Sequence, residues 1–555
     1  MRRSTGNGFE EASPSILISR RALLKASGAG LAGIAASTLF GGCSGADAGD
    51  RASSATPATR SEPAGNRGGA SSTGPVVSGI SLGPTTLDPH TSPQIGGLTI
   101  LLYLYETLYA PDIRPPYDMV PVLASGDPEQ VDETTYRISL RDGATFHDGK
   151  PVTAQAVVGS IERLRAEDTA SLLAQYLSFV EGVTAVDEAT VEIQTAFPTQ
   201  LLRERIGLVR VVPESLTEPG PIETFDTNPI GSGPYRTQNV GGDLRSFRFE
   251  RYPDYNGPRE PALDTIGIDV ILSDQSRISA LQTGRVLAMT DPPAQSIEQI
   301  ENDPRLNARG VPGFQQSLLL FNCGRPPFDD ARIRRAFIRA INRDTITQTA
   351  FFGRATPATS YLPETHPSYV QPTTDLTYDV NAARQLLAEA GAEDLQFEIL
   401  VSNLGWLSVQ APLIQADLQA VGMNVTIREG ETESLVPVVT SGDYAVWFTV
   451  TDPTVFGNTD AEFVIRWIYK GALPDTFNFW TAPEKDEIGM LLDEALQEES
   501  SDRLEQIYGD LQNIIADQVP SFPLHHREVL AAWSDELVVE PDPIYGVNLL
   551  QAERA

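Results

Sequence analysis

The sequence has 555 residues, of which 74 are acidic and 41 are basic, so its formal net charge is −33. A surface with this excess of carboxylates repels nucleic acid and anionic lipid headgroups, so neither is expected as a partner. The chain is longer than a single hydrophobic core supports, which predicts at least two lobes.

Residues 1–42 have the features of an export signal. The apolar run 26–40 is too short and too rich in small residues to span a bilayer, as expected of a cleaved leader. The stretch around Arg20 and Arg21 resembles a twin-arginine export signal. The sequence LFGGC, which ends at Cys43, resembles a bacterial lipobox and implies lipidation of that cysteine. The alternative is an uncharged leader with a chance arginine pair.

Residues 43–75 consist mainly of Gly, Ala, Ser, Thr and Pro, a composition that cannot bury enough apolar surface to fold. We interpret them as a flexible tether between a lipid anchor and a globular body. Without residues 1–42 the chain has 36 basic and 72 acidic side chains, a formal charge of −36. The predicted location is the outer face of the cell membrane, in a periplasm or at the cell surface. Acylation of Cys43 leaves Cys323 without a partner for an intramolecular disulfide.

The first half of the body is predicted to contain short strands separated by turns. Tyr136, Ile138 and Leu140 alternate with polar residues, and Asp-Gly pairs at 142–143 and 148–149 indicate turns on either side of a further strand. Residues 186–195 are predicted to form another strand pair.

The second half changes to alternating helices and strands. Helices are predicted at 333–341, with Asp329 or Asp330 as the cap, at 382–390, ending at Gly391, and at 412–421, ending at Gly422. Alternating apolar residues predict strands at 395–401 and 423–427. Strand, helix and strand in this order favour an α/β lobe.

Seven segments, in order, resemble the family 5 solute-binding proteins of ABC importers, which include oligopeptide, dipeptide and nickel binders. They are LDPH (87–90), YETLY (105–109), GSGPY (231–235) and the longer stretches 140–164, 319–346, 378–391 and 519–528. Ala156 departs from the family, in which an aspartate is usual at that place.

The resemblance implies an α/β periplasmic-binding-protein fold of class II, of the large cluster C type, with a two-segment hinge. Lobe I is expected to comprise 76–113, 225–323 and 515–555, the accessory domain 114–224, and lobe II 324–514. The hinge crossings are expected near 321–324 and 517–523. Ligand is then enclosed between the lobes as they close.

No constellation of catalytic residues is visible, so the protein is not expected to be an enzyme. The five histidines, at 90, 147, 366, 525 and 526, do not stand at metal-ligand or HExxH spacing, and adjacent His525 and His526 point to opposite faces of a strand. No Walker-type loop is present, and although the letters GISLG at 79–83 fit GxSxG, no base that would make Ser81 a nucleophile is recognised. Cys323 is expected to be a buried, inert thiol. Neither a cofactor nor a bound metal is predicted.

The ligand-binding candidates lie mostly in the second lobe. The segment 443–458 resembles the family segment along the cleft, in which an aspartate shortly after a tryptophan pairs with the amino group of a peptide. Here Trp447 keeps the aromatic position, Val450 stands at or beside the aspartate position, and Asp452 is next available, unless it only caps a turn. A valine there disfavours a peptide ammonium.

Three further groups complete the predicted site. Trp406 and Phe456 are aromatic candidates for stacking on the ligand, although either could be core. The loop after LDPH offers Ser92 and Gln94 but no acid. The loop and Val450 together favour a neutral or differently oriented ligand.

The predicted function is a lipid-anchored, monomeric receptor that delivers a small solute, most often a peptide in this family, to ABC permease subunits. Lobe closure on the ligand is the predicted mechanism. Alternatives within the same fold are an oligosaccharide, an opine-like compound or a metal chelate as cargo, or a sensory or peptide-chaperoning lipoprotein. An extracellular hydrolase is disfavoured.

Overall fold

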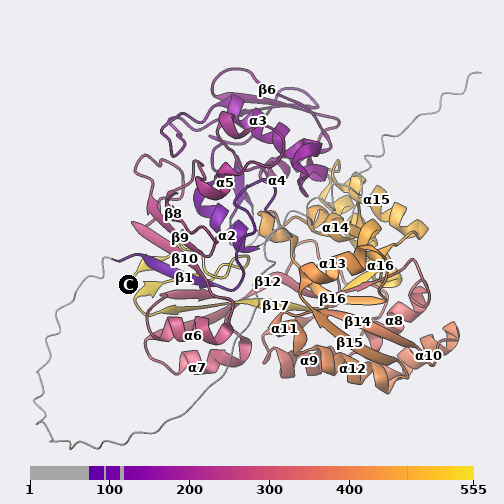
Figure 1. Cartoon of the computed structure of the whole chain (residues 1–555). Helices are drawn as coiled ribbons and strands as arrows, with labels where there is room; N and C mark the ends of the chain where they lie inside the picture. The colour runs from indigo at the N-terminus through magenta and orange to yellow at the C-terminus, as the bar shows by residue number, and fades with distance from the viewer. Residues whose placement is uncertain (1–73, 93–94, 113–117, 472) are drawn as a thin grey trace, which may run out of the picture.

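The computed structural model describes residues 74–92, 95–112, 118–471 and 473–555. Their largest element is an eleven-stranded sheet that passes through two lobes, in the order β15-β14-β16-β12-β17-β11-β1-β10-β9-β8, with β13 paired to β17 (Figure 1). The two-lobed α/β fold predicted from the sequence is confirmed.

Lobe I is built around β1 (Val76–Ile80), which lies parallel to β10 (Thr265–Val270) on one side and to β11 (Ala288–Thr290) on the other. All five β1 residues are buried, as expected of a strand between two parallel neighbours. The antiparallel strands β9 (Ser246–Arg251) and β8 (Tyr235–Val240) extend the sheet, and α6 (Asp274–Gln282) and α7 (Ile297–Glu301) belong to the same lobe.

In lobe II, β14 (Gln396–Ser402) lies between β15 (Asn424–Gly430) and β16 (Val446–Thr451), parallel to both. The predicted helices and strands of this lobe are confirmed. Asp330 caps α8 by accepting from the Arg332 backbone N–H at 2.8 Å, and Gly391 ends α10 with φ at +66°. The helices of lobe II are α8 (Ala331–Ala340), α9 (Arg343–Ala350), α10 (Val380–Ala390), α11 (Gly405–Ser408), α12 (Ala411–Ala420), α13 (Thr432–Thr440), α14 (Ala461–Tyr469), α15 (Pro483–Ala495) and α16 (Ser501–Gln518).

Two long strands, β12 (Leu306–Phe321) and β17 (Ser521–Ser534), join the lobes. One half of their ladder adjoins β11 of lobe I and the other half adjoins β16 of lobe II, and the register shifts between Pro312 and Gln316. The strands therefore pass between the lobes within their length, near 313–315 and 527, whereas the sequence placed the crossings at their lobe II ends. The apolar periodicity of a strand continues through such a crossing, so the position of the crossing cannot be predicted from the sequence pattern.

The accessory domain contains the antiparallel sheet β4-β5-β7-β6, with strands β4 (Glu129–Gln130), β5 (Thr135–Ser139), β7 (Thr190–Thr195) and β6 (Val180–Ala185). Helix α3 (Ala154–Arg165) packs on β6 and β7. The predicted strand pair at 186–195 is wrong in its first member, because Asp187 forms a turn with Ala189 and β6 ends before it. Thr153 caps α3 by accepting from the Ala156 backbone N–H, so the missing aspartate at 156 does not leave the helix uncapped.

Short elements complete the described chain. Helix α2 (Ile95–Leu104) belongs to lobe I, and α4 (Leu202–Ile206) and α5 (Thr224–Thr227) follow the accessory sheet. The remaining strands are β2 (Tyr109–Pro111) paired with β3 (Met119–Pro121), β13 (Ala355–Pro357), and β18 (Leu537–Val538) paired with β19 (Glu553–Arg554). The boundaries given above for the lobes and the accessory domain stay predictions.

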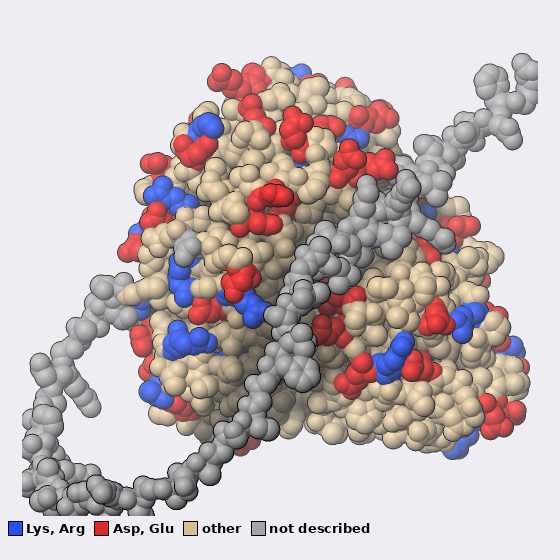
Figure 2. Space-filling model, in the orientation of Figure 1, with Lys and Arg blue, Asp and Glu red and all other residues tan. Residues whose placement is uncertain are grey.

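The surface carries the acidic character of the sequence. On the face shown in Figure 2, carboxylates lie over the accessory domain and both lobes, with lysine and arginine side chains singly or in small groups among them. Within the described ranges no helix combines the length and the apolar character needed to cross a bilayer.

Two of the sequence motifs meet where the accessory domain joins lobe I. The ring of His147 accepts from the Gly231 backbone N–H at 3.2 Å and donates to the Gly233 carbonyl at 3.0 Å. A Cβ on Gly231 would lie 1.9 Å from the Leu104 carbonyl oxygen, closer than any contact allows. GSGPY therefore needs glycine because another backbone passes directly over it.

Gly231→Ala is expected to lower the free energy of unfolding by about 1–3 kcal/mol, because the new methyl group must displace the backbone at Leu104. Urea unfolding followed by circular dichroism measures the change. The matched control is Gly126→Ala, where no atom lies within 4 Å of the new Cβ. Equal stability of the two variants would show that the backbone at Leu104 moves freely.

Candidate functional site

A cavity of about 80 Å³ lies where lobe I, the accessory domain and lobe II meet. A buried water needs roughly 10–15 Å³ of such space, so the cavity has room for about five to eight waters. Lobe II contributes Phe456 and Gly457, which follow β16. The other walls include Leu102, Tyr105, Glu106, Thr107, Gly207, Arg210, Tyr255, Arg259, Ile544, Tyr545 and Asn548. A partly open cavity with walls from both lobes is an arrangement that suits a small ligand.

Arg210 is the most unusual residue of this wall. Its side chain is 5% exposed, and no carboxylate or carbonyl in the described part of the chain accepts a hydrogen bond from its guanidinium. Burial lowers the pKa of Arg210, and only the hydroxyls of Tyr545 and Tyr105 oppose this electrostatically. A buried cation without a counter-ion is costly, so this cavity is electrostatically suited to an anion.

The LDPH motif holds the backbone of Arg210 in place. The His90 ring donates to the Arg210 carbonyl at 2.8 Å, and its other nitrogen accepts from Arg163 at 2.9 Å. Arg163 in turn forms a buried two-bond pair with Asp88, at 2.9 and 2.6 Å. Burial lowers the pKa of His90 to about 4, so the ring is neutral and fits this donor and acceptor pattern. The motif is thus structural, but it positions a cavity residue.

The other charged groups of the cavity are better compensated. Burial raises the pKa of Glu106, and the ion pair with Arg141 at 3.3 Å partly offsets this effect. Arg259 donates to the Pro111 carbonyl at 3.0 Å. Arg210 and Arg259 therefore both lack an ion pair in the described structure, but Arg259 is half-buried and hydrogen-bonded, whereas Arg210 is buried and donates to no acceptor there.

Asp452 lies a few residues before the cavity residues Phe456 and Gly457. One carboxylate oxygen caps the turn, accepting from the Thr454 backbone N–H at 3.0 Å, while the other is buried without a partner in the described structure. Burial raises the pKa of Asp452 to about 6, although the Thr454 hydrogen bonds and the Arg527 charge oppose the shift. Asp452 is thus a turn cap that keeps one oxygen available.

Arg527 lies at the crossing between the lobes, on β17. It forms an ion pair with Asp291 of lobe I, and its guanidinium carbon stands 4.6 Å from the ring centre of Trp406 in lobe II. Its Nε is buried without a partner in the described structure, as is the side-chain oxygen of Gln316 on the neighbouring strand. The crossing therefore contains polar groups that a ligand or water could satisfy.

The structure brings together only part of the predicted site. Phe456 lines the cavity, and its ring centre lies 5.2 Å from that of Trp467. Trp406 stacks on Arg527, and Val450 is half-buried on β16 opposite Ser317. Trp447 is buried in lobe II, donates to Ser402 at 3.2 Å, and does not line the cavity. Their roles in binding stay predictions.

The remaining predicted residues lie elsewhere. Ser92 is buried, with no hydrogen-bond partner for its hydroxyl in the described structure, and a Cβ on Gly97 would lie 2.3 Å from it. Gln94, Cys43, Arg20 and Arg21 lie outside the described residues.

Sequence reasoning missed Arg210. One pattern could have found it, because the arginine interrupts the apolar run 206–213, which predicts a buried charge, and arginine is almost never fully buried unless it is paired.

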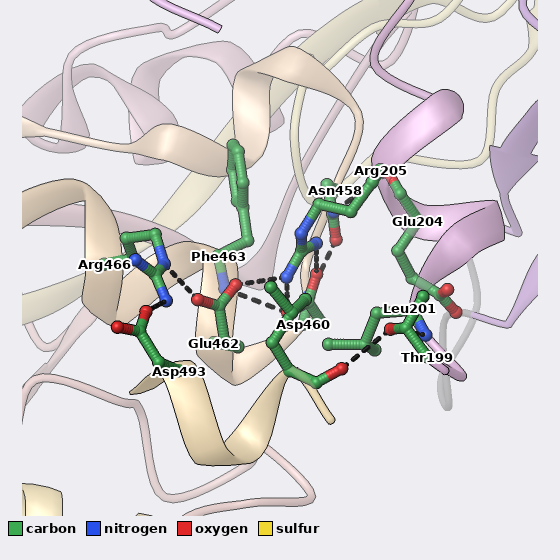
Figure 3. Close-up of polar contacts among 11 residues, drawn as sticks. Thr199, Leu201, Glu204, Arg205, Asn458, Asp460, Glu462, Phe463, Arg466 and Asp493 are labelled. Atoms are coloured by element: carbon green, nitrogen blue, oxygen red, sulfur yellow. Dashed lines mark hydrogen bonds and ion pairs between the residues drawn. The ribbon is translucent and has the colours of Figure 1, made fainter. Parts of the chain in front are cut away.

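An ion cluster joins the accessory domain to lobe II beside this cavity (Figure 3). Arg205 of α4 pairs with both oxygens of Asp460, at 2.6 and 3.0 Å, and with Glu462, which also pairs with Arg466. The Arg205 and Glu462 side chains are each 1% exposed. Burial raises the pKa of Asp460, but the Arg205 charge and the hydrogen bonds from Arg205, Phe463 and Asn458 together outweigh this effect, so the pKa is lowered.

Direct hydrogen bonds accompany the Arg205 cluster. The side chain of Asn458 donates to the Glu204 carbonyl at 3.1 Å, and the Thr199 hydroxyl donates to the Leu496 carbonyl at 2.7 Å. Asn458 immediately follows the cavity residue Gly457. The Arg205 cluster therefore fixes the lobe II wall of the cavity against the accessory domain.

Metal binding and thiol chemistry find no support in the part of the chain that the structure covers. No group of three or more His, Cys, Asp or Glu side chains there is arranged to hold an ion. Cys323 is buried, as predicted, and burial raises the pKa of its thiol to about 11. Such a thiol is protonated at neutral pH and unreactive.

Comparison with known proteins gives a consistent result. The family model described as "Bacterial extracellular solute-binding proteins, family 5 Middle" matches residues 118–472. The glutathione-binding protein GsiB of Escherichia coli K12 is 26% identical over 485 residues, covering 83% of this chain and 91% of GsiB.

Two solved structures share the fold at low sequence identity. The dipeptide binding protein of Pseudoalteromonas sp. SM9913, in complex with Met-Leu, has a TM-score of 0.76 at 21% identity, covering 87% of this chain and 100% of the other. The periplasmic binding protein AgaA of A. tumefaciens R10, in complex with agropinic acid, has a TM-score of 0.75 at 22% identity, covering 87% and 99%.

Proposed function

Because the chain belongs to the bacterial extracellular solute-binding proteins of family 5, which are receptors of ABC importers and not enzymes, we propose that it captures a short peptide for import. The observation that carries this proposal is the partly open cavity, whose walls come from lobe I, the accessory domain and lobe II together. A ligand that contacts all three parts stabilises the closed arrangement, which is the form a permease can distinguish.

The free oxygen of Asp452 supports a peptide as cargo. A buried carboxylate oxygen without a partner is a suitable acceptor for a ligand ammonium group, which would also lower the raised pKa of this carboxyl. Relatives that bind glutathione and Met-Leu support the same class. A second candidate for the cargo is an opine-like compound. Val450 favours it, because a valine side chain has no charge with which to pair a ligand ammonium group.

For the amino terminus we propose export through Arg20 and Arg21 and lipidation at Cys43, with residues 43–75 as the tether. The uncharged segment before LFGGC at the end of the leader supports this. Mass spectrometry of the membrane-associated protein tests it, since an acylated amino-terminal cysteine has a defined added mass, whereas Cys43→Ala would release the protein from the membrane.

Asp452→Asn is expected to abolish binding of a peptide with a free amino group, because the amide has no charge to pair with the ammonium. Thermal unfolding with Met-Leu and with N-acetyl-Met-Leu measures this. A ligand at 100 times its dissociation constant stabilises the folded protein by about 2.7 kcal/mol, which is readily detected.

The control for this experiment is Asp443→Asn, an exposed aspartate before β16 with only a 3.7 Å contact to Arg325. It should bind Met-Leu as the wild type does. If Asp452→Asn binds Met-Leu normally, Asp452 is a turn cap alone. If Met-Leu does not bind the wild type but an opine-like acid does, the protein is a receptor for the second class of cargo.

A further inference from the structure

We propose that the accessory domain is a latch for lobe II. The latch consists of the Arg205 cluster and the ring of Tyr176, and it favours the closed arrangement of the lobes before any solute binds. The proposed function requires only that a solute stabilises the closed arrangement. The latch adds a contribution to closure that comes from the protein itself and does not depend on the chemistry of the cargo.

The connection between the lobes permits bending. Strands β12 and β17 cross between the lobes, and the register of their ladder shifts between Pro312 and Gln316, so that residues 313–315 lie opposite Arg527 alone. Regular pairing is interrupted at the crossing, which is therefore the place where the lobes can bend relative to each other. Such a hinge does not by itself fix how far the lobes are open, so contacts elsewhere must decide it.

Lobe II meets the accessory domain through non-covalent contacts. With the bounds predicted above, the chain enters and leaves the accessory domain through lobe I. The contacts with lobe II include the ion pairs of Arg205 with Asp460 and Glu462 (Figure 3). They also include the hydrogen bonds that Asn458 and Thr199 donate across this boundary. All of these contacts are lost if lobe II swings away from the accessory domain, and they form again on closure.

An aromatic contact adds apolar burial to the same boundary. The ring centre of Tyr176, in the accessory domain, lies 4.5 Å from that of Phe463 on α14. The Tyr176 ring is also nearly parallel to the Trp467 ring, with 6.5 Å between the ring centres. Tyr176 and Phe463 are buried. Opening would return these rings to water, so closure gains hydrophobic free energy without a solute.

The ion pairs fix the orientation of the closed arrangement. Arg205 is buried, and its carboxylate partners in the described structure, Asp460 and Glu462, both belong to lobe II. Both oxygens of Asp460 accept from the guanidinium, a geometry that allows little change in the angle between the two sides. Separation of the lobes would leave Arg205 without an ion-pair partner. The rings therefore favour closure, and the charges specify one closed orientation.

The test measures the distance between the accessory domain and lobe II in the absence of solute. Spin labels on Val186→Cys and Met490→Cys, two exposed positions on these parts, report the distance by double electron–electron resonance. The full chain carries Cys43→Ser in addition, so that no label attaches there, and Cys323 is buried. Refolding from denaturant removes any bound solute before the measurement.

The protein with an intact latch should give one short distance. Arg205→Met should shift the distribution to longer distances, and Tyr176→Ala should do the same, which keeps the test decisive if Arg205→Met does not fold. The matched control is Arg343→Met, because Arg343 is a buried arginine whose guanidinium donates to the carbonyls of Ala358 and Leu376 within lobe II. This control should keep the short distance.

A second measurement follows the release of Met-Leu in a stopped-flow experiment. Loss of the latch should speed release roughly tenfold or more, because the solute alone then holds the lobes closed. An open protein with the latch intact, an unchanged distance in either folded latch variant, or release at the wild-type rate would overturn the latch and leave the receptor function intact. If Met-Leu does not bind the wild type, the proposed cargo fails, and the distances without solute alone decide the role of the latch.

Discussion

Arg205→Met is expected to lower the free energy of unfolding by about 3–5 kcal/mol, because it leaves the Asp460 carboxylate without a cation and Glu462 with Arg466 alone. Asp460 and Glu462 would then share a buried site without the cation that now contacts both. Since the cluster joins the accessory domain to the lobe II wall of the cavity, solute affinity should fall as well (Figure 3). Urea unfolding and calorimetric titration measure the two effects.

The matched control for this prediction is Arg503→Met. Arg503 pairs with Glu494 at 2.7 Å, but both side chains are more than one third exposed, so its loss should cost less than about 1 kcal/mol. Combining Arg205→Met with Asp460→Asn and Glu462→Gln should recover part of the stability, since it removes the uncompensated charges. Wild-type stability of the single Arg205 variant would show that water reaches the cluster.

Acidification is expected to destabilise the protein strongly, because four of the five histidines are buried and the fifth, His147, is half-buried. Burial lowers the pKa to about 4 for His90, His147 and His526 and to about 3 for His525, and it also lowers the pKa of His366. In each ring Nε2 lies within hydrogen-bond distance of a backbone carbonyl, which the neutral ring satisfies as a donor.

The direction of the change in unfolding free energy with pH follows from proton binding. The unfolded histidines take up protons near pH 6.5 and the folded ones only at lower pH, near 4 for His90, His147 and His526, so stability is complete above about pH 6.5 and falls as the pH approaches 4. For one such histidine the difference between the folded and unfolded pKa corresponds to about 3 kcal/mol. Asp452 acts in the opposite direction, since its pKa is raised to about 6 and its protonation between pH 6 and 4 favours folding.

Urea unfolding between pH 7.5 and 4.5 tests this prediction. The unfolding free energy should fall by several kcal/mol, because five histidines outweigh Asp452 and the other carboxyls whose pKa burial raises. His147→Gln should be less stable than the wild type at pH 7.5. Its unfolding free energy should fall less on acidification, since one titrating group has been removed. An unfolding free energy that stays constant or rises on acidification would show that the buried rings are protonated without cost.

Local interactions explain what could be predicted without the structure. Asp330 and Gly391 bound their helices, and the alternating residues of 395–401 form β14, because caps, turns and periodicity act over a few neighbouring residues. The crossing of β12 and β17 between the lobes could not be found this way. A strand that passes from one lobe to the other within the same sheet keeps its alternation, and only its neighbouring strands change.

The sequence by itself determined the family, the α/β character of the lobes and the inert surroundings of Cys323, because each depends on motifs or local composition. Only the tertiary structure decided which charges meet. Arg205 finds Asp460 and Glu462 more than 250 positions away, Asp88 and His90 find Arg163, and Arg210 finds no acid. Ion pairing depends on distances of a few ångströms between segments remote in the chain, so these pairs, and the lack of a carboxylate beside Arg210, become visible only in the folded structure.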